Sequence, residues 1–209
     1  MLYILSAAVG YILGSFPSAY IFLKRAKSID ITKTGTGNVG AMNAFEITNS
    51  RSLGLFIFLV DALKGLLSVY LMILIFHLNF IFPSIALLFA VVGHCYSPWI
   101  SFKGGRGLAT AAGGLLLLSP LLVFLWVAIW VLFYLVKREI IISNVFATVF
   151  SMIFIFSFSR FFFRFTFPRP DSYSTFNIFA SAILLIILIK HFEPLQSLIT
   201  QNKVYSTKD

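Results

Sequence analysis

The chain has 209 residues, of which 59% are hydrophobic and only 11% are charged. Soluble domains carry about a quarter charged residues, so the composition excludes an ordinary soluble globular protein and indicates an integral membrane protein. The net charge of +9 does not favour nucleic acid as a partner, because basic residues that flank membrane spans on the cytoplasmic side give the same sum.

Seven apolar segments predict an all-α, polytopic integral membrane helix bundle that forms a single domain over residues 1–209. Several segments are shorter than the ~20 residues that a perpendicular span requires. Ser119-Pro120 resembles an N-cap followed by proline at the first helical position, which divides one long apolar run into two helices. The seven segments cover residues 2–23, 53–79, 83–98, 107–118, 120–136, 141–158 and 176–192.

The distribution of basic residues predicts the topology. If the N-terminus lies outside and the chain crosses seven times, the C-terminus is cytoplasmic, and twelve Lys and Arg residues face the cytoplasm against three outside. This asymmetry follows the positive-inside rule. Both glycine-rich segments described next would then face the cytoplasm. The twelve are Lys24, Arg25, Lys27, Lys33, Arg51, Lys103, Arg106, Lys137, Arg138, Lys190, Lys203 and Lys208, and the three are Arg160, Arg164 and Arg169.

The first glycine-rich segment is Lys33–Asn43, in which Gly35, Gly37 and Gly40 alternate with hydroxyl and amide side chains. Glycine allows backbone N–H groups to converge, and convergent N–H groups form an anion site. The glycine spacing formally matches the dinucleotide-binding fingerprint, but that motif needs a preceding strand within a βαβ unit. A charged segment precedes it here, so we expect a phosphate site beside the membrane, with a flexible loop as the alternative.

The second segment is Phe102–Thr110, where Lys103 and Arg106 flank two glycines directly before an apolar helix. This composition is typical of an anion site at a helix N-terminus. A simple positive-inside anchor is the alternative, although an anchor does not require glycines. His94 precedes this segment and is expected to brace it.

Three further polar residues lie in apolar helices. Asp61 and Lys64 share one face of the second segment, and burying both in lipid would be costly, so we expect them to pair. His191, at the end of the last segment, is either functional or an interfacial residue. The His, Cys and carboxylate residues show no metal-ligand spacing, so the sequence predicts no metal site and no cofactor.

In these motifs the chain resembles the bacterial acyl-phosphate:glycerol-3-phosphate acyltransferase family of integral membrane enzymes. The matches fall in the family's order and cover most of residues 10–115. They are Gly14–Pro17, Lys33–Asn43, Asp61–Gly65, and Gly93-His94 followed by Phe102–Thr110. Five positions depart from the family pattern: Thr36 stands for Ser, Arg106 for Lys, Glu46 for Arg, and Phe192 and Pro194 for the Arg and Asn of a final His-Arg-Glu-Asn.

The resemblance implies acyl transfer from acyl phosphate to the 1-hydroxyl of sn-glycerol 3-phosphate, which gives lysophosphatidic acid in phospholipid synthesis. It implies seven spans in the bacterial inner membrane, contact with membrane lipid and a cytoplasmic active site; it gives no oligomeric state. The alternatives are a relative that has lost activity or changed acceptor, and a carrier for phosphorylated substrates. The candidate catalytic residues are Thr36, Lys103 and His191, and the candidate substrate-binding residues are Gly35, Gly37, Asn38, Gly40, Asn43, Gly104, Gly105 and Arg106.

Overall fold

A computed structural model describes residues 1–77 and 79–206, with side chains described as far as Thr200. These residues form ten α-helices and two 3-10 helices, and no β-strand occurs among them. The α-helices are α1 (Leu2–Ser15), α2 (Ser18–Lys27), α3 (Ala41–Thr48), α4 (Arg51–Phe76), α5 (Ile81–Cys95), α6 (Leu108–Leu118), α7 (Pro120–Lys137), α8 (Ile140–Ser157), α9 (Ser159–Arg164) and α10 (Tyr173–Ser206). The 3-10 helices are η1 (Ile31–Lys33) and η2 (Pro98–Ile100).

The prediction of an all-α membrane bundle is confirmed. Within the described residues, five helical segments are long and apolar enough to cross a membrane. Two shorter apolar helices, α5 and α6, lie at the predicted third and fourth segments. The five long segments are Leu2–Lys27, Arg51–Phe76, Pro120–Lys137, Ile140–Ser157 and Tyr173–Thr200. The count of seven spans and the orientation of the termini stay predictions.

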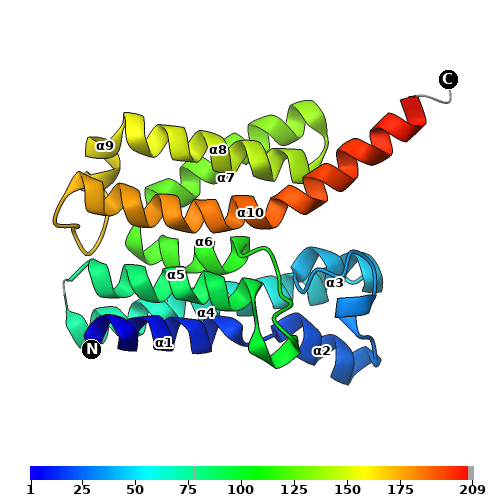
Figure 1. Ribbon diagram of the computed structural model, residues 1–209, viewed down its shortest axis with the longest axis horizontal. Coiled ribbons are helices and arrows are strands. Elements are labelled where there is room, and N and C mark those ends of the chain that lie inside the picture. Colours follow the sequence, from blue (N-terminus) through cyan, green and yellow to red (C-terminus); the bar gives the residue numbers. More distant parts are fainter. Residues whose placement is uncertain (78, 207–209) are drawn as a thin grey trace.

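The long helices form two layers that run along the longest axis of the molecule (Figure 1). One layer contains α1, α4, α5 and α6, and the other contains α7, α8 and α10. The N-terminus lies at one end of this axis, and the described end of α10 lies at the other. Only 6% of the residues in the apolar window of α7 are fully buried, so most of its apolar side chains are at least partly exposed. Such a surface is compatible with lipid tails and costly in water.

Small residues allow the helices of the first layer to approach closely. Gly10 and Gly14 of α1 pack against the backbone of Ala86 and Ala90 in α5, where an added Cβ would overlap carbonyl groups. Gly65 of α4 packs in the same way against Thr110 of α6. Close approach through small residues is the usual basis of helix association in membranes. The Gly10-x-x-x-Gly14 spacing therefore serves helix packing.

The first apolar segment departs from the prediction of one continuous helix over residues 2–23. The helix is interrupted at Phe16-Pro17, and α2 begins at Ser18. Proline lacks a backbone N–H and disfavours helical geometry in the residue before it, so a helix commonly ends there. The predicted division at Ser119-Pro120 is confirmed, but the Ser119 side chain makes no capping hydrogen bond to α7. Proline alone begins that helix.

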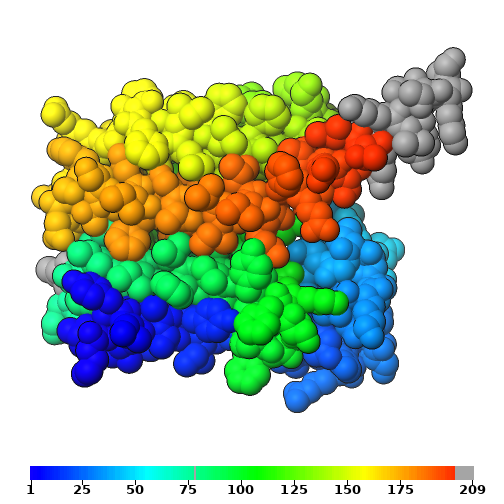
Figure 2. All heavy atoms as spheres, in the orientation of Figure 1, coloured from blue at the N-terminus to red at the C-terminus, as the bar shows by residue number. Residues whose placement is uncertain are grey.

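Two hydrophobic clusters stabilise the bundle and one of its ends. The larger cluster fills the space between the two layers and includes Leu87, Leu122 and Ile183. The smaller cluster joins α2, η1, α3, α4 and η2, with Leu23 and Ile57 fully buried at its centre. At this end of the molecule, opposite the N-terminus, α2, α3 and the loop before α6 lie together (Figures 1 and 2). The smaller cluster thus supports the first glycine-rich loop through Val39 and the segment before the second loop through Ile100.

Candidate functional site

The first glycine-rich loop, residues 34–40, is organised by one buried side chain. The amide of Asn43 accepts a hydrogen bond from Thr36 N at 3.0 Å. Its Nδ2 donates to Thr34 O at 3.1 Å and to Asn38 O at 2.9 Å. Both amide hydrogens of Asn43 are therefore engaged within the loop. The candidate substrate-binding residue Asn43 thus shapes the loop, and its donors are not directed at a ligand.

Glycine is required in this loop for conformational reasons. Gly35 and Gly37 have φ values of 62° and 70°, in the left-handed region that other residues rarely adopt. A Cβ at Gly35 would also overlap Asn43 Oδ1. The Thr36 side chain, between these two turns, is exposed. Its hydroxyl oxygen accepts a long hydrogen bond of 3.4 Å from Asn38 N.

The second glycine-rich loop, residues 103–107, is held by backbone packing. Gly105 N donates to His94 O at 3.0 Å. A Cβ at Gly104 would overlap the same carbonyl oxygen, and a Cβ at Gly105 would overlap His94 Nε2. The expectation that His94 braces this segment is confirmed by these contacts. Gly107, with φ of 85°, then turns the chain into the N-terminus of α6.

The structure brings the two loops together although they are far apart in sequence. Val39 N of the first loop donates to Gly104 O of the second at 3.2 Å. Val39 is 4% exposed and belongs to the smaller hydrophobic cluster, so the junction of the loops is buried. Gly40 then leads into α3 and Gly107 into α6. Two helix N-termini, whose N–H groups attract anions, therefore begin directly after the joined loops.

The two cations of the second loop differ in their surroundings. Lys103 is exposed, so its ammonium group can move toward a bound anion. Arg106 is half-buried, and this burial lowers the pKa of its guanidinium, whereas the charges of Glu46 and Glu193 raise it. An arginine side chain remains charged because its ordinary pKa is so high. Arg106 thus lies within electrostatic reach of two carboxylates, one of which is the Glu46 that departs from the family pattern.

His191 lies in a buried chain of hydrogen bonds between α8 and α10. Its Nδ1 lies 2.7 Å from Ile187 O, and because a carbonyl can only accept, Nδ1 carries the proton. Its Nε2 lies 3.2 Å from Asn144 Nδ2, which donates to it. Trp130 Nε1 donates to Asn144 Oδ1 at 2.7 Å. Both ring nitrogens of the candidate catalytic His191 are therefore engaged with the protein.

The final helix differs from its prediction beyond His191. It was expected to end near residue 192, but α10 continues through Pro194 to Ser206. Proline has no N–H to donate to the carbonyl four residues earlier, which here is Lys190 O.

The Lys190 ammonium lies 4.6 Å from the centre of the Tyr96 ring, a cation–π contact between α10 and the loop after α5.

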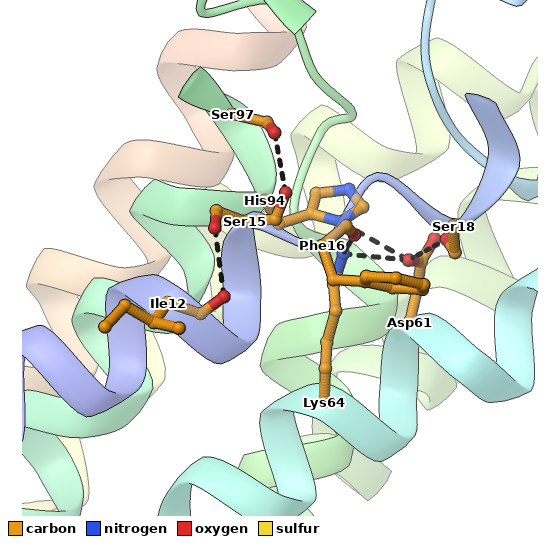
Figure 3. Close-up of polar contacts among 8 residues, drawn as sticks. All are labelled: Ile12, Ser15, Phe16, Ser18, Asp61, Lys64, His94 and Ser97. Carbon is orange, nitrogen blue, oxygen red and sulfur yellow. Dashed lines mark hydrogen bonds and ion pairs between the residues drawn. The ribbon is translucent and has the colours of Figure 1, made fainter. Parts of the chain in front are cut away.

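A polar cluster lies beneath the joined loops, at the break between α1 and α2 (Figure 3). The expected pairing of Asp61 and Lys64 is confirmed, with Asp61 Oδ1 2.9 Å from Lys64 Nζ and both side chains buried. Ser18 Oγ donates to the same carboxylate oxygen at 2.6 Å. His94 Nδ1 lies 3.6 Å from it and has no hydrogen-bond partner among the described residues.

A small, partly open pocket connects this cluster with the two loops. Its wall includes Val39 and Gly104, the two residues that join the loops, together with the Lys64 and His94 side chains. No group of three potential metal ligands occurs in the described part of the chain. The lining residues are Ser15, Phe16, Pro17, Ser18, Val39, Lys64, His94, Ser97, Ile100 and Gly104.

Comparison with known proteins identifies the family. The family model described as glycerol-3-phosphate acyltransferase matches residues 4–201. The chain belongs to the glycerol-3-phosphate acyltransferase family. Among curated members, the chain is 42% identical over 129 residues to the protein of Bacillus subtilis (strain 168), covering 62% of this chain and 65% of that one. The protein of Helicobacter acinonychis (strain Sheeba) is 34% identical over 119 residues, covering 54% of each chain. The matched region thus spans about half the length of the latter relative.

Solved structures extend the likeness over almost the whole chain. The crystal structure of PlsY (YgiH), described as an integral membrane glycerol 3-phosphate acyltransferase in its glycerol 3-phosphate form, has a TM-score of 0.78 and 26% identity. The comparison covers 95% of this chain and 92% of that one. A second structure of the same protein, in the lysophosphatidic acid form, matches equally well. Together with the apolar helices, this likeness makes the present acyltransferase-family chain a multi-pass membrane protein.

Sequence reasoning missed Ser18 and Ser97 of the polar cluster and included Ser15 only as part of the Gly14–Pro17 motif. Ser18 and Ser15 flank the helix break, and Ser97 Oγ donates to Ser15 O at 2.6 Å. The signal for Ser18 was available, because a serine directly after Phe16-Pro17 stands where a new helix would begin. No local signal identifies Ser97, since its contact is made to a residue 82 positions away. Asn144 had a weak signal as an amide within an apolar helix.

Proposed function

We propose that this chain is an acyltransferase that moves an acyl chain from acyl phosphate to the 1-hydroxyl of sn-glycerol 3-phosphate. The products are lysophosphatidic acid and inorganic phosphate. The observation that carries the proposal is the hydrogen bond from Val39 N to Gly104 O, which joins two glycine-rich loops of anion-binding character. Because both substrates carry a phosphate group, the reaction requires a site that binds two anions close together.

The solved relative supports the choice of substrates. PlsY (YgiH) has been crystallised in a glycerol 3-phosphate form and in a lysophosphatidic acid form, which correspond to the acceptor and the product of the proposed reaction. The match to the family model, over residues 4–201, includes both loops that form the candidate site here. An acyl phosphate donor is supported by the family resemblance of these loops and by the chemistry of their charges.

The proposed reaction makes modest demands on the protein. The 1-hydroxyl oxygen attacks the acyl carbon, a new C–O ester bond forms, and the bond from that carbon to the phosphate oxygen breaks. The hydroxyl proton passes to a phosphate oxygen, so protons and charge balance without a protein base. An acyl phosphate is already activated, and the protein's contribution is to position the two reactants and to stabilise negative charge.

The residues contribute to this reaction in different ways. We assign to Lys103 the neutralisation of charge on the leaving phosphate, because its ammonium is exposed beside the joined loops. Arg106 binds a phosphate through its planar fork of donors. Thr36 presents its hydroxyl to one of the substrates, and the N–H groups of Gly35, Gly37, Asn38, Gly40, Gly104 and Gly105 contribute to the anion-binding surface. His191, whose nitrogens are both engaged, acts by keeping Asn144 and α10 in place.

The orientation in the membrane follows from the same proposal. We place the joined loops at the cytoplasmic face of the bacterial inner membrane, with the N-terminus outside and the C-terminus inside after seven crossings. The start of α1 and the described end of α10 lie at opposite ends of the bundle axis, which supports an odd number of crossings (Figure 1). Labelling of Thr36→Cys with a membrane-impermeant thiol reagent in right-side-out vesicles, on a Cys95→Ala background, should fail. Labelling from outside would contradict this orientation.

The deciding experiment supplies the purified protein with long-chain acyl phosphate and glycerol 3-phosphate. We expect lysophosphatidic acid and phosphate in equal amounts. Lys103→Ala and Arg106→Ala should each lower turnover severely, whereas Lys137→Ala, an exposed lysine at the end of α7, serves as the matched control and should not. Binding of glycerol 3-phosphate without product would instead indicate a relative with lost activity or a changed acceptor. Uptake of a phosphorylated substrate into proteoliposomes without turnover would indicate a carrier.

A further inference from the structure

The ion pair of α4 is placed at the break between α1 and α2. Lys64 Nζ donates to Phe16 O at 3.0 Å, next to the C-terminal end of α1. Asp61 accepts the hydrogen bond from Ser18, the first residue of α2. A helix carries partial negative charge at its C-terminus and partial positive charge at its N-terminus. Each charge of the pair therefore faces the helix end of opposite sign, and the pair bridges the interruption (Figure 3).

Two connections lead from this break to the second glycine-rich loop. Ser97 Oγ donates a hydrogen bond to Ser15 O at 2.6 Å, and Ser97 N donates one to Lys103 O at 3.0 Å. The position of the Lys103 backbone is thereby tied to the end of α1. The second connection runs from Asp61 to the His94 ring, whose Nε2 lies against Gly105 and whose carbonyl oxygen accepts from Gly105 N.

The first glycine-rich loop is connected to the helix break through the second loop. Gly104 O accepts the hydrogen bond from Val39 N, so any displacement of residues 103–105 is transmitted to residues 34–40. Asp61 is 1% exposed and Lys64 is 7% exposed. Both charges are already engaged with the backbone and side chains of the helix break. This degree of engagement suits a positioning role better than direct contact with a phosphate group.

We infer that Asp61 and Lys64 form a positioning pair that fixes the two glycine-rich loops in one arrangement through the break between α1 and α2. This inference rests on the proposed function for its kinetic consequences. It goes beyond that function because it assigns a role in substrate affinity to an ion pair at the helix break, outside both glycine-rich loops. Loss of the pair should reduce the fraction of molecules in which both loops are correctly placed.

The kinetic signature follows from that reduction. When only a fraction of the molecules has a competent site, the apparent dissociation constant rises in inverse proportion to the fraction. Because the loops are joined, KM for acyl phosphate and KM for glycerol 3-phosphate should rise together. A residue with a purely structural role would lower the melting temperature and the amount of active protein, and it would leave both KM values unchanged.

The main variant is Asp61→Leu/Lys64→Met, which removes both charges together. Replacing a buried ion pair with apolar residues of similar size is often neutral for stability, whereas removal of one partner leaves a buried charge without compensation. The double variant should therefore fold with a melting temperature near that of the wild type. We expect both KM values to rise by about tenfold or more, in line with a competent fraction reduced to a tenth.

A milder pair of variants keeps the inference testable if the double variant does not fold. Ser18→Ala removes the hydroxyl that Asp61 binds across the break. Ser68→Ala, its matched control, removes a buried hydroxyl of α4 that binds only Gly65 O within the same helix. Ser18→Ala should raise both KM values, Ser18→Thr should restore them, and Ser68→Ala should leave them unchanged.

Hydrogen–deuterium exchange provides a readout that needs no catalysis. Peptides covering residues 34–40 and 103–107 should exchange faster in the double variant and in Ser18→Ala than in the wild type and Ser68→Ala. Wild-type KM values and wild-type exchange in the double variant would overturn the positioning role. If the wild-type protein makes no lysophosphatidic acid, the proposed function fails, and the exchange rates alone still decide whether the pair fixes the loops.

Discussion

The two glycine-rich loops are held in place by different interactions. In residues 34–40 the shape depends on a side chain, because Asn43 makes three hydrogen bonds to the loop backbone. In residues 103–107 it depends on close packing, because Gly104 and Gly105 lie directly against His94 and Cys95. The first loop is open at Thr36, whereas Gly105 is buried.

This difference indicates how each loop responds to change. A loop held by hydrogen bonds can shift when one bond is lost. The loss in the free energy of unfolding then depends on the donors and acceptors that are left unpaired. A loop held by contact with backbone has no free volume for an added atom, so the surrounding structure must move. The comparison therefore predicts that steric changes will damage the second loop most, and that polar changes will damage the first loop.

Gly104→Ala should have the largest effect. The new Cβ would overlap the His94 carbonyl oxygen and the Cys95 carbonyl group, neither of which can move without moving α5. We expect a loss of about 1–3 kcal/mol in the free energy of unfolding. Activity should fall by about a hundredfold, the loss associated with a displacement of roughly 1 Å at a reacting centre. Thermal melting in detergent and the acyl phosphate assay measure the two effects.

Gly10→Ala is the matched control for this variant. Its Cβ would overlap the Ala86 carbonyl oxygen in the seam between α1 and α5, so the steric conflict is similar but lies within the bundle. The control should lose stability and keep the KM values of the wild type. If Gly104→Ala retained both KM and turnover, the second loop would not be held by close packing.

Asn43→Ala should have the second largest effect, because it removes the three bonds that shape the first loop. The unpaired groups of a partly buried loop predict a loss of about 1–3 kcal/mol. Asn43→Asp keeps the acceptor for Thr36 N and loses both donors, so its effect should be intermediate. Melting temperature and KM for each substrate report the result. Equal effects from Asp and Ala would mean that the Thr36 N contact contributes nothing.

Hydropathy and glycine spacing made much of this architecture predictable. The apolar runs identified the helices, because membrane helices need a continuous apolar surface that sequence displays directly. The spacing of Gly35, Gly37 and Gly40, and the glycines between Lys103 and Arg106, identified both loops. Each of these signals is local, and each depends on residues that are neighbours in the chain.

The rest of the site depends on contacts between distant residues. Val39 meets Gly104 because α2, α3, α4 and η2 pack around a shared hydrophobic cluster that includes Val39. The family resemblance predicts a catalytic His191, but the hydrogen bond that links this residue to Asn144 depends on how α8 packs against α10. Such contacts are set by tertiary packing, and no pattern within either segment reveals them.

Glu46→Gln should have a smaller effect, and in the opposite direction. The Glu46 carboxylate acts electrostatically on Arg106 and competes there with a substrate phosphate. Because Glu46 is exposed, its influence should resemble that of a surface ion pair, which is at most about 1 kcal/mol. We expect KM for a phosphate substrate to fall by up to about fivefold at low salt. The difference should diminish at high salt, since salt screens exposed charges. An increase in KM would show that Glu46 orients Arg106 and does not oppose it.

Thr36→Ser should have the smallest effect, because it restores the residue usual in the family and changes only one exposed methyl group. Surface substitutions of this kind usually change stability by less than about 0.5 kcal/mol. Serine keeps the hydroxyl, so turnover should stay within about twofold of the wild type, since 0.5 kcal/mol corresponds to little more than that. Thr36→Val provides the contrast, because it keeps the branched shape and loses the hydroxyl. If that hydroxyl binds a substrate, Thr36→Val should lower kcat/KM by about tenfold, the value of one hydrogen bond to a charged group. The substrate whose KM changes identifies the phosphate that the exposed first loop binds, and the second loop, which holds Lys103 and Arg106, then takes the other.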